Sequence, residues 1–76
     1  PTKQGTKVSP VIELFGKKFK AARRAAKLTQ RDIHRLTGIA VSYVSAVERC
    51  QRNLSLAHAE TLAQAVNQPL HKLLTP

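Results

Sequence analysis

The chain has 76 residues and a mass of 8.4 kDa, which excludes a multi-domain architecture and leaves room for one small core. Its 13 Lys and Arg against four Asp and Glu give a net charge of +9. This balance favours a polyanionic partner, nucleic acid first and an anionic membrane surface second. One cysteine cannot form an internal disulfide, and no apolar run approaches the roughly 18 residues of a membrane span, so a reducing cytoplasm fits best.

Residues 1–9 are polar and basic, and they predict a flexible N-terminal arm ahead of a single domain at residues 10–76. In this arm, Lys3 and Lys7 either reach a minor groove or contact nothing. A first helix is expected to begin at Pro10 with Ser9 as its cap. Its apolar face and its opposite, basic face follow from helical spacing: Ile12, Phe15, Phe19, Ala22 and Ala26 form the first, and Lys17, Lys20, Arg24 and Lys27 the second. The basic face is either a solvated surface or part of a polyanion-binding site.

Two short helices are expected next. Thr29 is a plausible N-cap for one of them, and Gly38 closes it. Val41, Val44 and Val47 then recur with helical spacing after a gap of about three residues. This outline is that of a helix-turn-helix or, alternatively, of an ordinary helical hairpin in a small bundle.

The remaining residues predict two more helices. Residues 50–54 break the periodicity, Ser55 can cap a fourth helix, and Asn67 is its expected left-handed end. Pro69 starts a last short helix. The predicted fold class is therefore all-α, a compact bundle of five short helices with no strand.

The segment from Thr29 to Leu74 resembles the Cro and phage-repressor (XRE-type) helix-turn-helix regulators, and YVSAVERCQRNLSL within it is similar to the controller proteins of restriction-modification systems. The resemblance rests on six positions with the family's spacing: Gln30, Gly38, Val44, Val47, Glu48 and Arg49. It implies a lambda-repressor-like fold with the helix-turn-helix in the second and third helices. It also implies a regulator, repressor or controller, that binds duplex DNA as a dimer on an inverted repeat in the cytoplasm of a bacterium or of a phage host. RNA polymerase is a further partner to consider.

Four positions depart from the family pattern. His34 stands where a small residue is usual, so either the second and third helices are forced apart or the ring points outward. Ala40 replaces the usual Ser or Thr, which weakens the N-cap of the third helix. Cys50 replaces a glycine, and Gln68 an apolar residue.

The third helix can read bases if it enters the major groove. Val44 and Val47 face the core, which leaves a small, polar outer face as the expected base-reading surface: Val41, Ser42, Ser45, Ala46 and Arg49. Arg49 suits guanine, although its place at the end of the helix also allows a phosphate contact. The expected phosphate-binding residues surround this helix in the sequence: Gln30, Thr29, Arg52, Asn53 and Tyr43. The family resemblance implies that Gln30 has this role and that Arg23 pairs with Glu48.

Catalysis has little support in this sequence. His34, His58 and His71 show no metal-ligand spacing, no carboxylates are paired, and no Gly-rich phosphate loop occurs. We therefore expect no enzymatic activity, cofactor, metal or small-molecule ligand, and we expect the histidines to be surface or packing residues. Cys50 is either incidental or, with Arg49 and Arg52 beside it, a thiol sensor.

Leu70, Leu73 and Leu74 present more apolar surface than a terminal helix can bury, so they are the expected dimer interface. Two other classes of function stay open. One is an antitoxin-like module whose main partner is another protein. The other is a polybasic membrane binder, which the lack of bulky interfacial aromatic residues disfavours.

Overall fold

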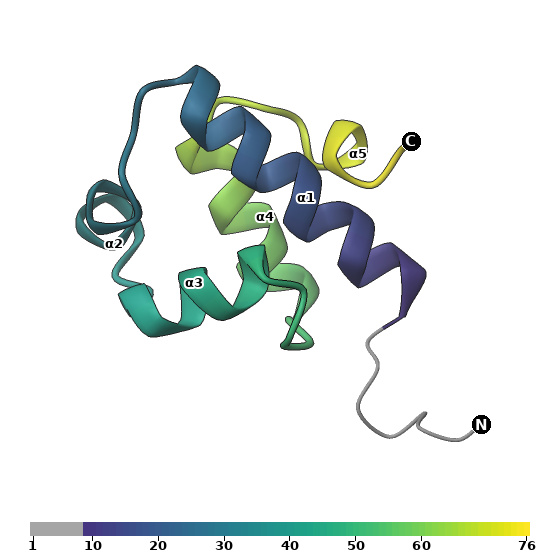
Figure 1. Ribbon diagram of the computed structural model, residues 1–76. Helices are drawn as coiled ribbons and strands as arrows, with labels where there is room; N and C mark the ends of the chain where they lie inside the picture. The colour runs from purple at the N-terminus through teal and green to yellow at the C-terminus, as the bar shows by residue number, and fades with distance from the viewer. Residues whose placement is uncertain (1–8) are drawn as a thin grey trace.

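The computed structural model describes residues 9–76, so the predicted N-terminal arm with Lys3 and Lys7 lies outside the described residues except for Ser9 (Figure 1). The described part contains helices and no strand, which confirms the predicted all-α fold. The helices are α1 (Pro10–Ala25), α2 (Gln30–Thr37), α3 (Val41–Glu48), α4 (Leu56–Ala65) and α5 (Leu70–Leu73). None of them is long and apolar enough to cross a membrane.

Three of the helices begin with the predicted side-chain caps. The hydroxyl oxygens of Ser9, Thr29 and Ser55 accept hydrogen bonds from backbone N–H groups in the first turns of α1, α2 and α4. A cap of this kind satisfies a donor that has no partner within the helix. At the start of α3, Ala40 has no such side chain. The departure seen in the sequence therefore leaves the N-terminus of α3 without a side-chain cap.

Each of the first four helices is followed by a residue in the left-handed conformation. The φ angles are 61° at Lys27, 80° at Gly38, 60° at Cys50 and 59° at Asn67. Glycine adopts this conformation without penalty, and asparagine tolerates it better than most residues. Cys50 thus occupies a glycine-favouring turn, which gives a physical reason for the glycine that the family usually has there.

The core forms where α1 lies across the other helices (Figure 1). α1 packs against α3 and α5, and α2 packs against α3 and α4. The rings of Phe15 and Phe19 stack with centroids 5.9 Å apart at the centre of the packing. Ala26, which we expected on the core face of the first helix, is exposed because α1 ends one residue before it. The buried apolar residues are Phe15, Phe19, Ile33, Val44, Val47, Ala59, Leu62, Ala63, Val66 and Leu73.

Gly16 marks the closest approach between α1 and the end of α3. A Cβ atom at this position would stand 2.3 Å from the carbonyl oxygen of Val47 and 3.2 Å from Sγ of Cys50. Any larger residue must therefore push α1 away from α3. Glycine at position 16 lets the two helices pack in direct backbone contact.

Candidate nucleic-acid interface

The solvent exposure of the side chains on α3 decreases from the start of the helix to its middle. Val44 and Val47 are buried, as the periodicity predicted. Val41 and Ser42 at the start of the helix are exposed, whereas Ser45 and Ala46 are half-buried. The two exposed residues therefore offer the most accessible surface for contact with bases.

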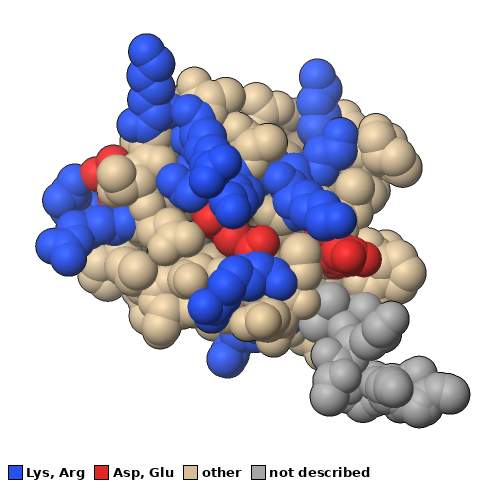
Figure 2. Space-filling model, in the orientation of Figure 1, with Lys and Arg blue, Asp and Glu red and all other residues tan. Residues whose placement is uncertain are grey.

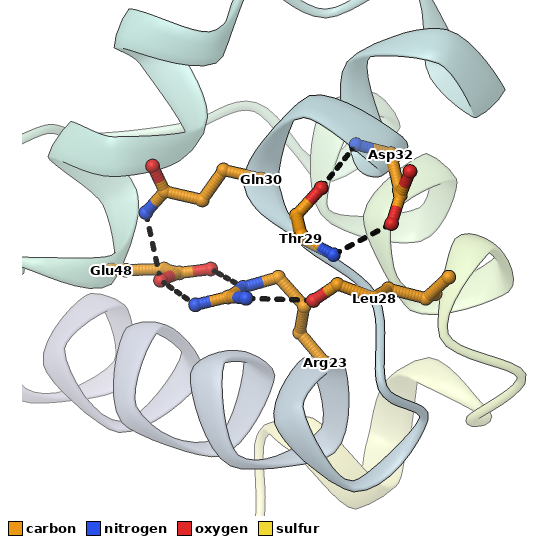
Figure 3. A network of polar contacts seen from close by, with 6 residues as sticks. All are labelled: Arg23, Leu28, Thr29, Gln30, Asp32 and Glu48. Atoms are coloured by element: carbon orange, nitrogen blue, oxygen red, sulfur yellow. Dashed lines mark hydrogen bonds and ion pairs between the residues drawn. The ribbon is translucent and has the colours of Figure 1, made fainter.

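A polar network fixes the other end of α3 (Figure 3). Arg23 on α1 donates to both carboxylate oxygens of Glu48, from Nε at 2.6 Å and from Nη2 at 3.0 Å. Its Nη1 donates to the carbonyl oxygen of Leu28 at 2.7 Å. Only 2% of the Glu48 side chain and 12% of the Arg23 side chain are exposed. The structure thus brings together the two residues that the family resemblance paired.

Gln30, at the first position of α2, joins the same network. Its Nε2 donates to Oε1 of Glu48 at 3.1 Å (Figure 3). The amide oxygen of Gln30 has no partner among the described residues. The carboxylate of Glu48 on α3 therefore links this helix to α1 and α2, and it fixes the position of the Gln30 side chain.

The start of α2 is held by a reciprocal capping pair. Thr29 Oγ1 accepts from the N–H of Asp32 at 3.0 Å, and the carboxylate of Asp32 accepts from the N–H of Thr29 at 2.9 Å. This backbone hydrogen bond from Thr29 is the main cause that lowers the pKa of Asp32 below its ordinary value of 3.8. The hydroxyl of Thr29 and the nearby Arg35 act in the same direction. The hydroxyl oxygen of Thr29 thus accepts as a cap and its N–H donates to Asp32. Accepting does not use the O–H as a donor, so the phosphate contact expected at Thr29 stays a prediction.

A cluster of ring and guanidinium groups lies beside the start of α3. The guanidinium carbon of Arg52 stands 4.5 Å from the centroid of the Tyr43 ring. On α4, Nδ1 of His58 lies 3.2 Å from the hydroxyl oxygen of Tyr43, and the two ring centroids are 5.0 Å apart. Asn53, next to Arg52, is exposed. Two of the expected phosphate-binding residues, Arg52 and Tyr43, are thus in contact, and His58, which we expected to be a surface or packing residue, contacts Tyr43.

Arg49 lies at the opposite end of α3, in a different environment. It lines a surface hollow together with Lys17, Lys20 and Arg24 of α1. Figure 2 shows the concentration of Lys and Arg on this face of the molecule. Arg49 is more than 20 positions away from the three α1 residues in the sequence, so only the crossing of α1 over the end of α3 brings them together. Glu13 and Glu48 also line this hollow, but the cations outnumber them. This grouping favours a phosphate contact for Arg49, whereas we expected it to read a base.

At His34, one of the departures from the family pattern, the structure decides between the two expected outcomes. The ring is exposed, and its Nδ1 lies 2.9 Å from the carbonyl oxygen of Ile39 in the turn between α2 and α3. The ring therefore points outward and contacts the turn, and α2 and α3 pack directly against each other. The turn itself is three residues long, from Gly38 to Ala40.

The three C-terminal leucines separate into two groups. Leu73 is 3% exposed and belongs to the core of its own chain, while Leu70 and Leu74 are half-buried at its edge. A side chain that is already buried has little surface left for a second subunit. The expected dimer interface therefore retains Leu70 and Leu74, and Leu73 acts in the monomer core.

Two short helices joined by a three-residue turn, with the exposed start of α3 near Arg52, define a helix-turn-helix DNA-binding regulator of the Cro and phage-repressor type. A helix-turn-helix family model matches residues 19–73. The chain belongs to this family.

Relatives among known proteins include restriction-modification regulators. Control protein C.SmaI of Serratia marcescens is 32% identical over 65 residues, which cover 86% of this chain and 77% of that protein. The crystal structure of controller protein C.AhdI from Aeromonas hydrophila is 37% identical with a TM-score of 0.76, and the match covers 82% of this chain and 94% of that one. C.Esp1396I, solved as a tetramer with its natural 35-base-pair operator, is 22% identical with a TM-score of 0.77 over 88% of this chain and 97% of that one. That similarity shows a shared fold.

Proposed function

We propose that the protein is a sequence-specific transcriptional regulator that binds duplex operator DNA through α3, as a repressor or controller of the restriction-modification type. The observation that carries this proposal is the start of α3, where Val41 and Ser42 are exposed and the next residue, Tyr43, contacts the guanidinium of Arg52. Regulation follows from occupancy of the operator, which excludes or contacts RNA polymerase, and needs no catalytic step.

Base reading falls to the outer face of α3 in this proposal. Ser42 donates to or accepts from base edges, and Val41 and Ala46 contact thymine methyl groups. Ser45 makes a further contact with the base edges in the groove. Each of these side chains is small, so the helix can lie close to the floor of the groove.

Phosphate contacts fix the position of the helix without reading sequence. At the start of α2 the free backbone N–H groups beside Thr29 and the Gln30 side chain face one strand. Tyr43, Arg52 and Asn53 approach the other. Arg49, with the α1 cations, extends the contact along the backbone.

A dimer on an inverted repeat places two α3 helices about 34 Å apart, one turn of DNA. Leu70 and Leu74 supply the apolar surface between subunits. Sedimentation of the wild type and of Leu70→Glu/Leu74→Glu tests this arrangement. A monomeric wild type at tens of micromolar, or a variant that dimerises equally well, contradicts it.

Selection of bound sequences from a random duplex pool tests the function directly. We expect enrichment of one inverted repeat and a log-log dependence of affinity on salt steeper than about −2, because several phosphates release counterions. Arg49→Ala should weaken specific and scrambled duplexes by the same factor, whereas Ser42→Ala should relax the choice at one base pair. Recovery of no preferred sequence contradicts the proposal.

A further inference from the structure

A group of cations lies at the C-terminal end of α3, away from the exposed start that we propose to read bases. We call this surface the α1 hollow, because three of its cations belong to α1; the cations that line it are Lys17, Lys20, Arg24 and Arg49. Figure 2 shows Lys and Arg side chains gathered on this face of the molecule. The eight residues of α3 rise about 12 Å, so the hollow lies about this far from the reading end.

The two carboxylates in the α1 hollow are already paired. Both oxygens of Glu48 accept hydrogen bonds from Arg23, and only 2% of the Glu48 side chain is exposed. The carboxylate of Glu13 lies 3.7 Å from Nζ of Lys17, one turn further along α1. Each carboxylate thus has a cation of its own, and the remaining cations of the hollow are not neutralised by these two groups.

Three cations of the α1 hollow have no acidic partner in the described part of the chain. Lys20, Arg24 and Arg49 form no ion pair within residues 9–76, and residues 1–8 contain no Asp or Glu. Arg24 and Arg49 are exposed, and Lys20 is half-buried. Like charges that stand together in a concave surface attract ions of the opposite sign. The hollow is therefore suited to a polyanion.

The spacing of the α1 cations fits one strand of duplex DNA. Lys17 and Arg24 share a face of α1 and are about two turns apart, which is a rise of about 10 Å. One strand carries a phosphate about every 3.4 Å along the axis of the duplex, so this row matches about three phosphates. A row of charges over this length fits a linear polyanion better than it fits a single small anion.

The position of the α1 hollow indicates which part of the DNA it meets. The major groove is about 12 Å wide, which is about the rise of α3. When the start of α3 lies at the base edges, the cations at its other end therefore lie at the border of the groove or beyond it. Exposed charges more than about 8 Å apart are largely screened at physiological ionic strength, so these cations act only on phosphates close to them.

We propose that the α1 hollow binds the phosphate backbone of the duplex that flanks the operator. This inference rests on the proposed function, which places Arg49 and the α1 cations on the DNA backbone. It adds where on the DNA they bind, and it makes affinity depend on the length of duplex outside the base pairs that α3 reads.

Fluorescence anisotropy with two labelled duplexes tests the inference. One duplex ends at the inverted repeat selected from the random pool, and the other carries about ten further base pairs, one helical turn, on each side. The full chain is titrated at constant ionic strength as wild type, Lys20→Gln/Arg24→Gln and Lys18→Gln/Lys72→Gln. The two double variants lose the same charge, but Lys18 and Lys72 do not line the hollow. Lys, Arg and Gln have similar helix propensities, so both variants should fold.

We expect the wild type and Lys18→Gln/Lys72→Gln to bind the long duplex at least about fivefold more tightly than the short one. Their log-log salt slope should be steeper by at least about 2 on the long duplex, because each further phosphate neutralised contributes about −0.9. Lys20→Gln/Arg24→Gln should bind the short duplex like the wild type and lose most of the gain on the long one. Its normal affinity for the short duplex would also show that it is folded.

Equal affinity of the wild type for the two duplexes would overturn the inference, and so would an undiminished gain in Lys20→Gln/Arg24→Gln. A loss in this variant that is the same on both duplexes would place the cations on the operator itself and would also overturn it. A loss of the gain in Lys18→Gln/Lys72→Gln to the same extent would show an effect of net charge and not of the hollow. A random pool that yields no preferred repeat would instead contradict the proposed function.

Discussion

The two ends of α3 are held in different ways. Its C-terminal end carries a buried carboxylate bonded to two other helices, and it packs against the backbone of α1 at Gly16. Its N-terminal end has no side-chain cap, and Val41 and Ser42 there are exposed. Packing and ion pairing thus fix the helix at one end and leave the other end free to contact a ligand. A reading surface needs this combination, because accessible side chains specify a site only when their support is rigid.

The largest effect should come from breaking the network at the C-terminal end. Glu48→Ala leaves the Arg23 guanidinium largely buried without its partner, and we expect a loss of about 3 kcal/mol of unfolding free energy. Arg23→Ala/Glu48→Ala should lose less than the sum of the single variants, since neither charge is then left alone. Urea denaturation of the four proteins measures this coupling. Strictly additive losses would mean that the pair does not stabilise the junction.

Gly16→Ala should have the next largest effect, about 2 kcal/mol of destabilisation, because the added Cβ overlaps the Val47 carbonyl. The sign is diagnostic, since alanine in place of glycine at an open helix position stabilises by about 1 kcal/mol. Thermal unfolding measures the change. A stabilised variant would show that α1 and α3 are not in backbone contact.

Cys50→Gly should relieve the strain of the left-handed backbone conformation at this residue, two positions after the end of α3. The expected gain is at most about 1 kcal/mol, because the variant also loses the contacts of Sγ near Gly16. Lys27→Gly is a matched control, with a φ angle of 61° on an exposed residue. Its gain in unfolding free energy should be the larger of the two. The reverse order would show that the Cys50 side chain contributes nothing to the packing.

The smallest effect concerns pH and the start of α2. The hydrogen bond from the Thr29 N–H lowers the pKa of Asp32, so the stabilisation is present above the ordinary value of 3.8 and is lost as pH falls through the lowered value. Asp32→Asn keeps an oxygen acceptor but has no charge. The melting temperature of the wild type should exceed that of this variant at pH 6, and the gap should narrow at pH 3. A constant gap would mean that the charge of Asp32 is not responsible.

The helices were predictable because their limits depend on local chemistry. Ser9, Thr29 and Ser55 cap, and Gly38 and Asn67 terminate, wherever they occur with suitable neighbours. The Arg23–Glu48 pair followed from the family resemblance, not from spacing. Most of the fold and the supported end of α3 were thus open to prediction.

The parts that escaped prediction depend on how the helices cross. His58 meets Tyr43 from another helix, 15 residues away, and no periodicity links the two. Arg49 joins the basic residues of α1 only because α1 crosses the end of α3. Leu73 enters the core because α5 folds back on α1 and α4, whereas the sequence showed only an apolar residue near the chain end.

Amide chemical-shift changes on adding a duplex selected from the random pool test the central claim most directly. The account predicts the largest changes at the start of α3, in Val41, Ser42 and Tyr43, with smaller changes at Gln30 and Arg52. The amides of Leu70 and Leu74 should change little. Large changes confined to α5, with the start of α3 unaffected, would contradict the claim that the exposed end of α3 reads DNA.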